Sequence, residues 1–156
     1  MNDLILVFSY FIVWSIILFL PSYLLTKVPN DYFNPRSFLF KEKKWKFKGK
    51  LYERVFFIKR WKAFLPDGAK IFKNGFEKKH LKTFSIDYLE NFVIESCRAE
   101  LAHLLPILLS LTFALYNPPK IVLTMFLFGV FINLPCIVTQ RYNRIRINKI
   151  LNKLKK

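Results

Sequence analysis

The stretch Leu4 to Leu25, LILVFSYFIVWSIILFLPSYLL, decides the fold of this chain. Its 22 residues include no Asp, Glu, Lys, Arg or His. A helix of that length spans the roughly 30 Å hydrocarbon core of a bilayer. The alternative is a cleaved signal peptide, which needs a basic start and a small-residue cleavage site, whereas the chain begins Met1-Asn2-Asp3. We therefore expect a retained membrane anchor.

Two further apolar runs predict a transmembrane hairpin. Residues 101–116 are interrupted only by His103, and residues 121–139 carry a single amide, Asn133. The Asn117-Pro118-Pro119-Lys120 sequence between them is a turn with no helical competence. The sequence therefore predicts an all-α integral membrane protein with a single membrane domain over residues 1–156. Its three spans are expected at about 4–25, 100–116 and 121–140.

The charge distribution predicts the orientation. The 156 residues include 26 Lys+Arg and 10 Asp+Glu, a net charge of +16. Residues 26–98 hold 18 of the basic and 8 of the acidic side chains, while the tail 141–156 holds 7 basic and none acidic. With three spans both segments share one side, which the positive-inside rule assigns to the cytoplasm, leaving the N-terminus outside. We expect a multi-pass protein of the cell membrane that contacts an anionic inner leaflet. No nucleic-acid-binding motif accompanies the charge.

The segment 26–98 between the first two spans is rich in aromatic residues, which disordered chains lack. Around Lys50 to Leu65, apolar residues recur at near-helical spacing between Lys and Arg, which predicts a helix in the headgroup layer. The Leu65-Pro66-Asp67-Gly68 sequence should end it as a turn. A second helix is expected to start at Ser85-Ile86-Asp87 and to run through Arg98 into the second span. The segment is thus a basic, aromatic-rich cytoplasmic interfacial region.

Ionisable side chains gather at the inner end of the second span. In a helix, Glu95 lies one turn from Arg98, and Glu100 lies one turn from His103. Charged groups at membrane depth are costly, so they are functional candidates by default. A glutamate bonded to one imidazole nitrogen would leave the other free as a base, which makes His103 and Glu100 the candidate catalytic pair. The alternative is an ordinary helix end whose ionic side chains reach headgroup water.

The third span carries a matching polar face. Asn133, Gln140 and Arg144 are separated by seven and four residues, which places them on one side of a helix. Pro106 and Pro135 are expected to interrupt their helices near this level and to free backbone carbonyls that need partners. A polar pocket near the cytoplasmic leaflet would provide those partners. The alternative is that Asn133 and Gln140 only join the helices through hydrogen bonds.

The common site motifs are absent. The chain contains no glycine-rich phosphate loop, no H-E-x-x-H and no G-x-S-x-G. His80 and His103 are too few and too far apart to indicate a metal site. Cys97 and Cys136 do not form a C-x-x-C motif. The sequence therefore predicts neither a metal nor a tightly bound cofactor.

Two longer stretches are distinctive. The run Glu95 to His103, ESCRAELAH, resembles the E-x-x-R-A-E-x-x-H stretch of the glycosyl-4,4'-diaponeurosporenoate acyltransferases. The run Asn133 to Arg146, NLPCIVTQRYNRIR, resembles their N-x-P-x-x-x-x-Q-R-Y-N-R-x-R. A departure is Leu104, where an aromatic residue is expected. The resemblance implies a small integral membrane enzyme that esterifies a sugar hydroxyl of a glycosylated C30 carotenoid, or of a related glycolipid, with a fatty acyl group.

The implied reaction assigns hypothetical roles. His103 would remove the proton of the sugar hydroxyl, and Glu100 would orient the imidazole. The acceptor would be a lipid-linked small molecule, and the acyl donor would be acyl-CoA or an acyl carrier protein. Candidate substrate- and oxyanion-binding residues are Glu95, Arg98, Asn133, Gln140, Arg141, Asn143 and Arg144. Candidate donor-binding residues are Lys59, Arg60 and Lys62.

Three other functional interpretations are consistent with the sequence. The chain could be a non-enzymatic membrane module that binds anionic lipid and a protein partner through its basic segment. It could instead act on a lipid phosphate held by Arg141, Arg144 and Arg146. Finally, Cys97 could be an acyl-enzyme nucleophile, because the neighbouring Arg98 could favour its thiolate.

Overall fold

The computed structural model describes residues 3–42, 49–65, 76–78 and 80–156. All regular structure in this part of the chain is helical. The elements are α1 (Asp3–Thr26), η1 (Asn30–Tyr32), α2 (Lys50–Arg54), α3 (Ile58–Trp61), η3 (Lys62–Phe64), α4 (Ile86–Leu109), η5 (Ser110–Leu115) and α5 (Pro119–Leu154). Three helices are long and apolar enough to cross a membrane, namely α1, α4 with η5, and α5. The predicted all-α fold with three membrane-spanning helices is confirmed.

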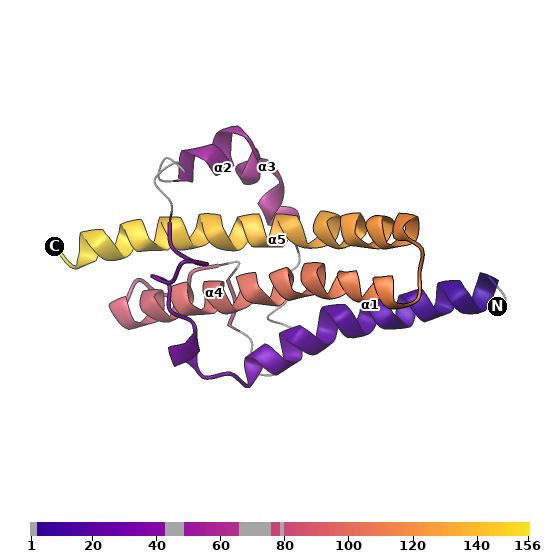
Figure 1. The fold of residues 1–156 in the computed structure, drawn as a ribbon. Coiled ribbons are helices and arrows are strands. Elements are labelled where there is room, and N and C mark those ends of the chain that lie inside the picture. Colours follow the sequence, from indigo (N-terminus) through magenta and orange to yellow (C-terminus); the bar gives the residue numbers. More distant parts are fainter. Residues whose placement is uncertain (1–2, 43–48, 66–75, 79) are drawn as a thin grey trace.

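The centre of the fold is the antiparallel hairpin of α4 and α5, which lie side by side (Figure 1). Ser85 precedes the first turn of α4, as expected, and Pro118 and Pro119 start α5. Proline suits this place because the first turn of a helix leaves its N–H groups unpaired in any case. The basic tail simply continues α5 as helix as far as Leu154.

The prolines within the spans do not break their helices. Pro106 lies inside α4 and Pro135 inside α5, and both helices are continuous around them. The predicted interruptions are therefore wrong. A proline removes one backbone donor, and a long helix that packs against a neighbour over many turns tolerates that loss.

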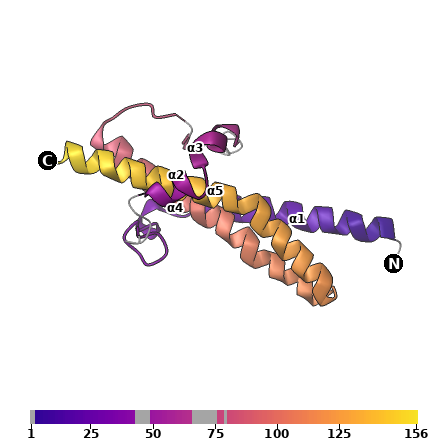
Figure 2. The same ribbon diagram turned by 90° about the horizontal axis from the view of Figure 1, so that it is seen from above.

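Near its middle, α1 is fixed by Trp14 to the half of the hairpin that lies nearer the turn between η5 and α5. The indole packs on Phe113 with ring centroids 5.8 Å apart, and its N–H points to the sulfur of Met125 at 3.2 Å. The approach is close because α5 has Gly129 here: a Cβ at that position would lie 2.9 Å from the Trp14 ring. One turn earlier Tyr10 still packs on Phe113, with ring centroids 5.7 Å apart, and before it the first turn of α1 runs apart from the hairpin (Figure 2).

The C-terminal end of α1 is held by Arg98 of α4. Its guanidinium donates hydrogen bonds to the backbone oxygens of Leu25 and Val28 and to the side chain of Asn30. Carbonyl groups at the end of a helix have no partner within it, so an arginine is well suited to satisfy them. We call this contact the Arg98 clamp.

The interfacial segment is not one helix. The chain forms α2, α3 and η3, with a break at Phe57, whose φ of +47° lies in the left-handed region. In an unbroken helix Tyr52 and Ile58 would lie about 120° apart around the axis. The break allows both to be buried against Val138 and Tyr142 of α5. The predicted continuous helix is therefore wrong, and the turn predicted after Leu65 falls on residues outside the described ranges.

Candidate functional site

A buried carboxylate joins α4 to α5. Glu100 is fully buried, and its two oxygens accept hydrogen bonds from Arg141 Nε and Arg144 Nη2. Arg144 also donates from Nη1 to the Ser96 hydroxyl at 3.3 Å. A buried charge is stable only when it is paired and hydrogen-bonded, and both conditions are met here. We refer to Glu100, Arg141 and Arg144 as the ionic layer.

One turn after Glu100 in α4, His103 contacts the side-chain amide of Asn133. Its Nδ1 lies 3.0 Å from Oδ1 of Asn133, and the Asn133 Nδ2 donates to the carbonyl oxygen of Gly129 at 3.0 Å. Because the second contact commits the amide nitrogen, the oxygen must face the imidazole. The neutral ring then carries its proton on Nδ1, which leaves the Nε2 lone pair available as a base.

This geometry differs from the expected pairing of His103 with Glu100. Both carboxylate oxygens of Glu100 are engaged by guanidinium groups, and the imidazole is instead oriented by Asn133. The helical spacing placed the two residues one turn apart correctly. However, it could not indicate that each would face a different partner on α5.

On α5, Gln140 lies between Asn133, which contacts His103, and the arginines of the ionic layer. It is two turns from Asn133 and about one turn from Arg144 on the same face of α5. Its side-chain oxygen is buried and, within the described ranges, has no hydrogen-bond partner; the same holds for the Thr139 hydroxyl. A buried acceptor without a donor is costly, which makes the Gln140 oxygen a candidate for contact with a substrate hydroxyl.

Two predicted site residues lie elsewhere. The Arg98 guanidinium is used up in the Arg98 clamp, where it binds carbonyl oxygens at the C-terminal end of α1. Its Cζ also lies 4.4 Å from the centroid of the Phe33 ring. Glu95 accepts a hydrogen bond from the Arg98 Nε at 3.1 Å and so belongs to the same contact. Their side chains hold α1 against α4, and the structure does not bring them to His103. Cys97 is fully buried in the adjacent apolar cluster, which leaves no access for a substrate carbonyl.

The three predicted donor-binding residues do not lie in one place. Lys59 forms an exposed salt bridge with Glu53 at 2.8 Å, and the exposed Arg60 stacks on Phe57. Lys62 turns towards α5, where its Nζ lies 3.5 Å from the Asn143 oxygen. Burial lowers the pKa of Lys62, and the nearby charges of Arg146 and Lys59 add to that shift. Thus only Lys62 of the three contacts a predicted residue of the third span.

A tyrosine fixes this segment to α5. The Tyr142 hydroxyl donates to Glu53 at 2.7 Å, and Tyr142 itself is buried. Hydrogen bonds from Lys59 and Tyr142 lower the pKa of Glu53. Glu53 and Tyr142 were not predicted as partners, because nothing in the local sequence indicates that α2 lies against this turn of α5.

A small polar recess adjoins the ionic layer. It is lined by Pro35, Phe40, Lys41, Glu42, Arg141, Arg144, Ile145 and Asn148. The Arg144 guanidinium lies over the Phe40 ring at 5.5 Å, so the segment after α1 forms one wall and α5 the other. Sequence reasoning missed Lys41 and Asn148, since only the folded chain brings them together. In the described ranges, no three His, Cys, Asp or Glu side chains could hold a metal ion.

The fold and this site define a small helical membrane protein with a histidine and an ionic layer between the two helices of its hairpin. Residues 35–153 match the family model for glycosyl-4,4'-diaponeurosporenoate acyltransferase. The relative of that name from Staphylococcus aureus strain MRSA252 is 36% identical over 132 residues, covering 84% of this chain and 79% of the relative. Those from strains RF122 / ET3-1 and USA300 are 34% identical over the same shares.

The chain therefore belongs to the glycosyl-4,4'-diaponeurosporenoate acyltransferase family, and it is an acyltransferase. The resemblance noted in the two sequence stretches is confirmed, because both lie within the matched residues. No solved structure matches the chain.

Proposed function

We propose that this acyltransferase moves a fatty acyl group from a thioester donor to a sugar hydroxyl of glycosyl-4,4'-diaponeurosporenoate or a related glycolipid. The names of the family and of the relatives support the acceptor. The observation that carries the chemistry is the hydrogen bond between His103 and Asn133, which leaves a basic imidazole nitrogen about one helical turn from the ionic layer.

In the proposed reaction, His103 Nε2 takes the proton of the sugar hydroxyl as its oxygen attacks the thioester carbonyl. The Gln140 amide N–H stabilises the tetrahedral oxyanion. Collapse of this intermediate breaks the carbon–sulfur bond, and the imidazolium returns its proton to the leaving thiolate. The products are the sugar ester and the free thiol.

Glu100 acts in this scheme through the arginines and not through the imidazole. Its two hydrogen bonds hold Arg141 and Arg144 in fixed positions, so their positive charge is already in place when an anionic donor binds. Asn133 takes the orienting role for His103. Gln140 contributes its oxygen, which has no partner among the residues that the structure describes, as an acceptor for a second hydroxyl of the sugar.

The proposed orientation places this layer at the cytoplasmic face, with the N-terminus outside. The C-terminus and the basic segment after α1 lie towards the same end of the molecule, away from the N-terminus (Figure 1). The acceptor would keep its polyene in the bilayer, while the donor, acyl-CoA or acyl carrier protein, arrives from the cytosol. Lys59, Arg60 and Lys62 would attract its acidic groups and the anionic inner leaflet.

Labelling of introduced cysteines tests this orientation. In intact cells, an impermeant maleimide should label Pro118→Cys, in the turn between η5 and α5, and should not label Lys82→Cys. Permeabilisation should expose the second site as the matched control. The reverse pattern would overturn the cytosolic donor site.

The function itself is tested by mass spectrometry of lipid extracts from a host that makes the glycosylated carotenoid. The expected product is the same molecule with one added fatty acyl ester, present with the wild-type chain and absent with His103→Ala. His80→Ala is the matched control, because His80 is exposed. An unchanged acceptor in the wild-type extract would refute the proposal.

A further inference from the structure

We propose that the polar recess beside the ionic layer binds the phosphate of a pantetheine-bearing acyl donor. This inference rests on the proposed function, because it specifies how the donor is held. Coenzyme A and acyl carrier proteins share a phosphate attached to a long pantetheine arm that ends in the thiol. The recess would therefore recognise the part that both donors have in common.

The charge of the recess fits an anion. Its lining includes three cations, Lys41, Arg141 and Arg144, against one carboxylate, Glu42. Glu100 lies behind the wall and is paired with both arginines, which leaves an excess of one positive charge. Asn148 adds an amide donor that a phosphate oxygen can use.

The donors of the recess are also held in place. Glu100 engages Arg141 only through Nε, and in the part of the chain that the structure describes both terminal nitrogens of this guanidinium have no other partner. Arg144 is fixed by Glu100, by Ser96 and by the Phe40 ring. Arginine donors of this kind match the oxygens of a phosphate, and fixing them beforehand reduces the entropy lost on binding.

The position relative to His103 fits the shape of such a donor. Arg144 follows Asn133 by eleven residues of continuous helix, or about 16 Å along α5. The recess thus lies nearer the C-terminal end of α5, and His103 lies nearer the turn that joins η5 to α5. A pantetheine arm separates phosphate from sulfur, so a phosphate in the recess lets the thioester extend towards the imidazole.

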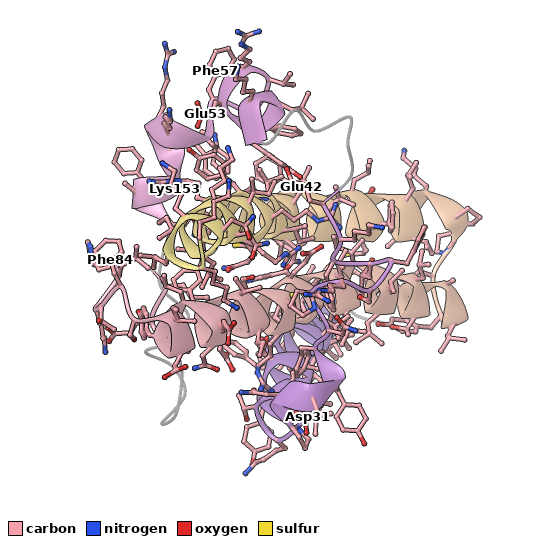
Figure 3. The ribbon with its side chains drawn as sticks, turned by 90° about the vertical axis from the view of Figure 1, so that its left-hand side faces the viewer. Asp31, Glu42, Glu53, Phe57, Phe84 and Lys153 are labelled. Atoms are coloured by element: carbon pink, nitrogen blue, oxygen red, sulfur yellow. The ribbon has the colours of Figure 1, made fainter. Side chains whose placement is uncertain are left out.

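The patch of Lys59, Arg60 and Lys62 is less well arranged for this task. Lys59 is neutralised by Glu53, and Arg60 is exposed on Phe57. Figure 3 shows the molecule from the end of α5, with Glu42 of the recess apart from Phe57 and Glu53. We therefore assign the phosphate contact to the recess. The patch of Lys59, Arg60 and Lys62 would only attract the acidic donor to this side of the protein.

Binding of coenzyme A to the full chain tests the proposal. The protein is reconstituted in nanodiscs of zwitterionic lipid, and titration calorimetry measures the dissociation constants of coenzyme A and of pantetheine, which lacks phosphate. The variants are Lys41→Gln, Lys41→Arg and Asn148→Asp. Lys153→Gln is the matched control, because it removes an exposed charge near the end of α5, away from Glu42 in Figure 3.

The expected result is that coenzyme A binds and pantetheine binds much more weakly. Lys41→Gln and Asn148→Asp should each raise the coenzyme A dissociation constant roughly tenfold, since a lost hydrogen bond to a charged group has that effect. Lys41→Arg and Lys153→Gln should bind as the wild type does. Melting temperatures measured on the same samples should agree within error, which shows that the variants are folded.

Three outcomes would overturn the inference. Coenzyme A and pantetheine could bind equally, or Lys41→Gln could match Lys153→Gln. Nanodiscs containing phosphatidylglycerol could also abolish coenzyme A binding in a manner that depends on Lys41, which would make the recess a lipid headgroup site. The proposed function fails separately: His103→Ala should bind coenzyme A normally, and a wild-type chain that binds it yet forms no ester would refute only the reaction.

Discussion

Asn133 of α5 holds the imidazole of His103 through a contact of 3.0 Å between Oδ1 and Nδ1, and its own amide group is fixed by the Gly129 carbonyl. The tautomer of the histidine is thus set by a neutral carboxamide. A carboxylate in the same place would set the same tautomer and would also stabilise an imidazolium by its charge, which a neutral amide does not do. The contact also joins the middle of the hairpin, so the proposed base and the packing of the two helices depend on the same residue.

Removal of the imidazole should abolish most turnover. We expect His103→Ala to lower the acyl-transfer rate by about 10²- to 10⁴-fold, the usual contribution of a general base. Its stability should also fall, by about 1–3 kcal/mol, because the buried Asn133 oxygen loses its partner while Asn133 keeps its Gly129 contact. His80→Ala should behave as wild type. Near-normal transfer by His103→Ala would exclude general-base catalysis by this residue.

Asn133 and Gln140 should respond differently to apolar replacement. Asn133→Leu removes two hydrogen bonds and leaves buried groups unpaired, so we expect a loss of about 1–3 kcal/mol in stability together with reduced turnover. Gln140→Met removes an oxygen that has no partner among the described residues, so stability should be unchanged or higher while turnover falls. Melting curves and transfer rates measured in parallel check both. If Gln140→Met is less stable and fully active, this side chain serves only to join the helices.

The ionic layer should be sensitive to loss of its single acid. Glu100→Gln leaves Arg144 buried without a counter-charge, and breaking a buried pair in this way costs about 3–5 kcal/mol. Addition of Arg144→Met should recover part of the loss, because the remaining Arg141 is partly exposed and can reach water. A double-mutant cycle on melting free energies measures the coupling. Additive effects of the two changes would show that the layer is not a unit.

The close approach of α1 to α5 should depend on Gly129. In Gly129→Ala, the new Cβ would lie 2.9 Å from the buried Trp14 ring, so the indole or α1 must move. We expect destabilisation of about 1–3 kcal/mol, as for other overpacked cores. Trp14→Phe in the same background should restore part of the stability by making room. Equal melting temperatures for wild type and Gly129→Ala would contradict the close packing.

The sequence predicts the membrane-spanning helices well because the constraint is local. A helix in hydrocarbon must satisfy its own backbone and be apolar over its length, which is visible in the runs before and after Pro118-Pro119. The start of α4 at Ser85 and the shared face of Asn133, Gln140 and Arg144 also follow from helical spacing. These features depend on residues close together in the chain.

The partners across the helices could not be predicted in the same way. Whether Glu100 meets His103 or two arginines depends on the rotation and axial offset of α4 and α5, which spacing does not reveal. Arg98 is directed to α1 because the carbonyls of Leu25 and Val28 come within its reach only in the folded chain. Similarly, the break at Phe57 reflects the burial of Tyr52 and Ile58 against α5.

The fully buried carboxylate of Glu100 also constrains biogenesis. While α4 emerges from the ribosome, its two arginine partners on α5 are still about forty residues behind. A lone α4 in the lipid would carry an unpaired acid, which insertion machinery accepts only at a cost of about 2.5–3.5 kcal/mol. We therefore expect α4 to remain near the translocation channel until α5 arrives, so that the two helices enter the bilayer as one unit.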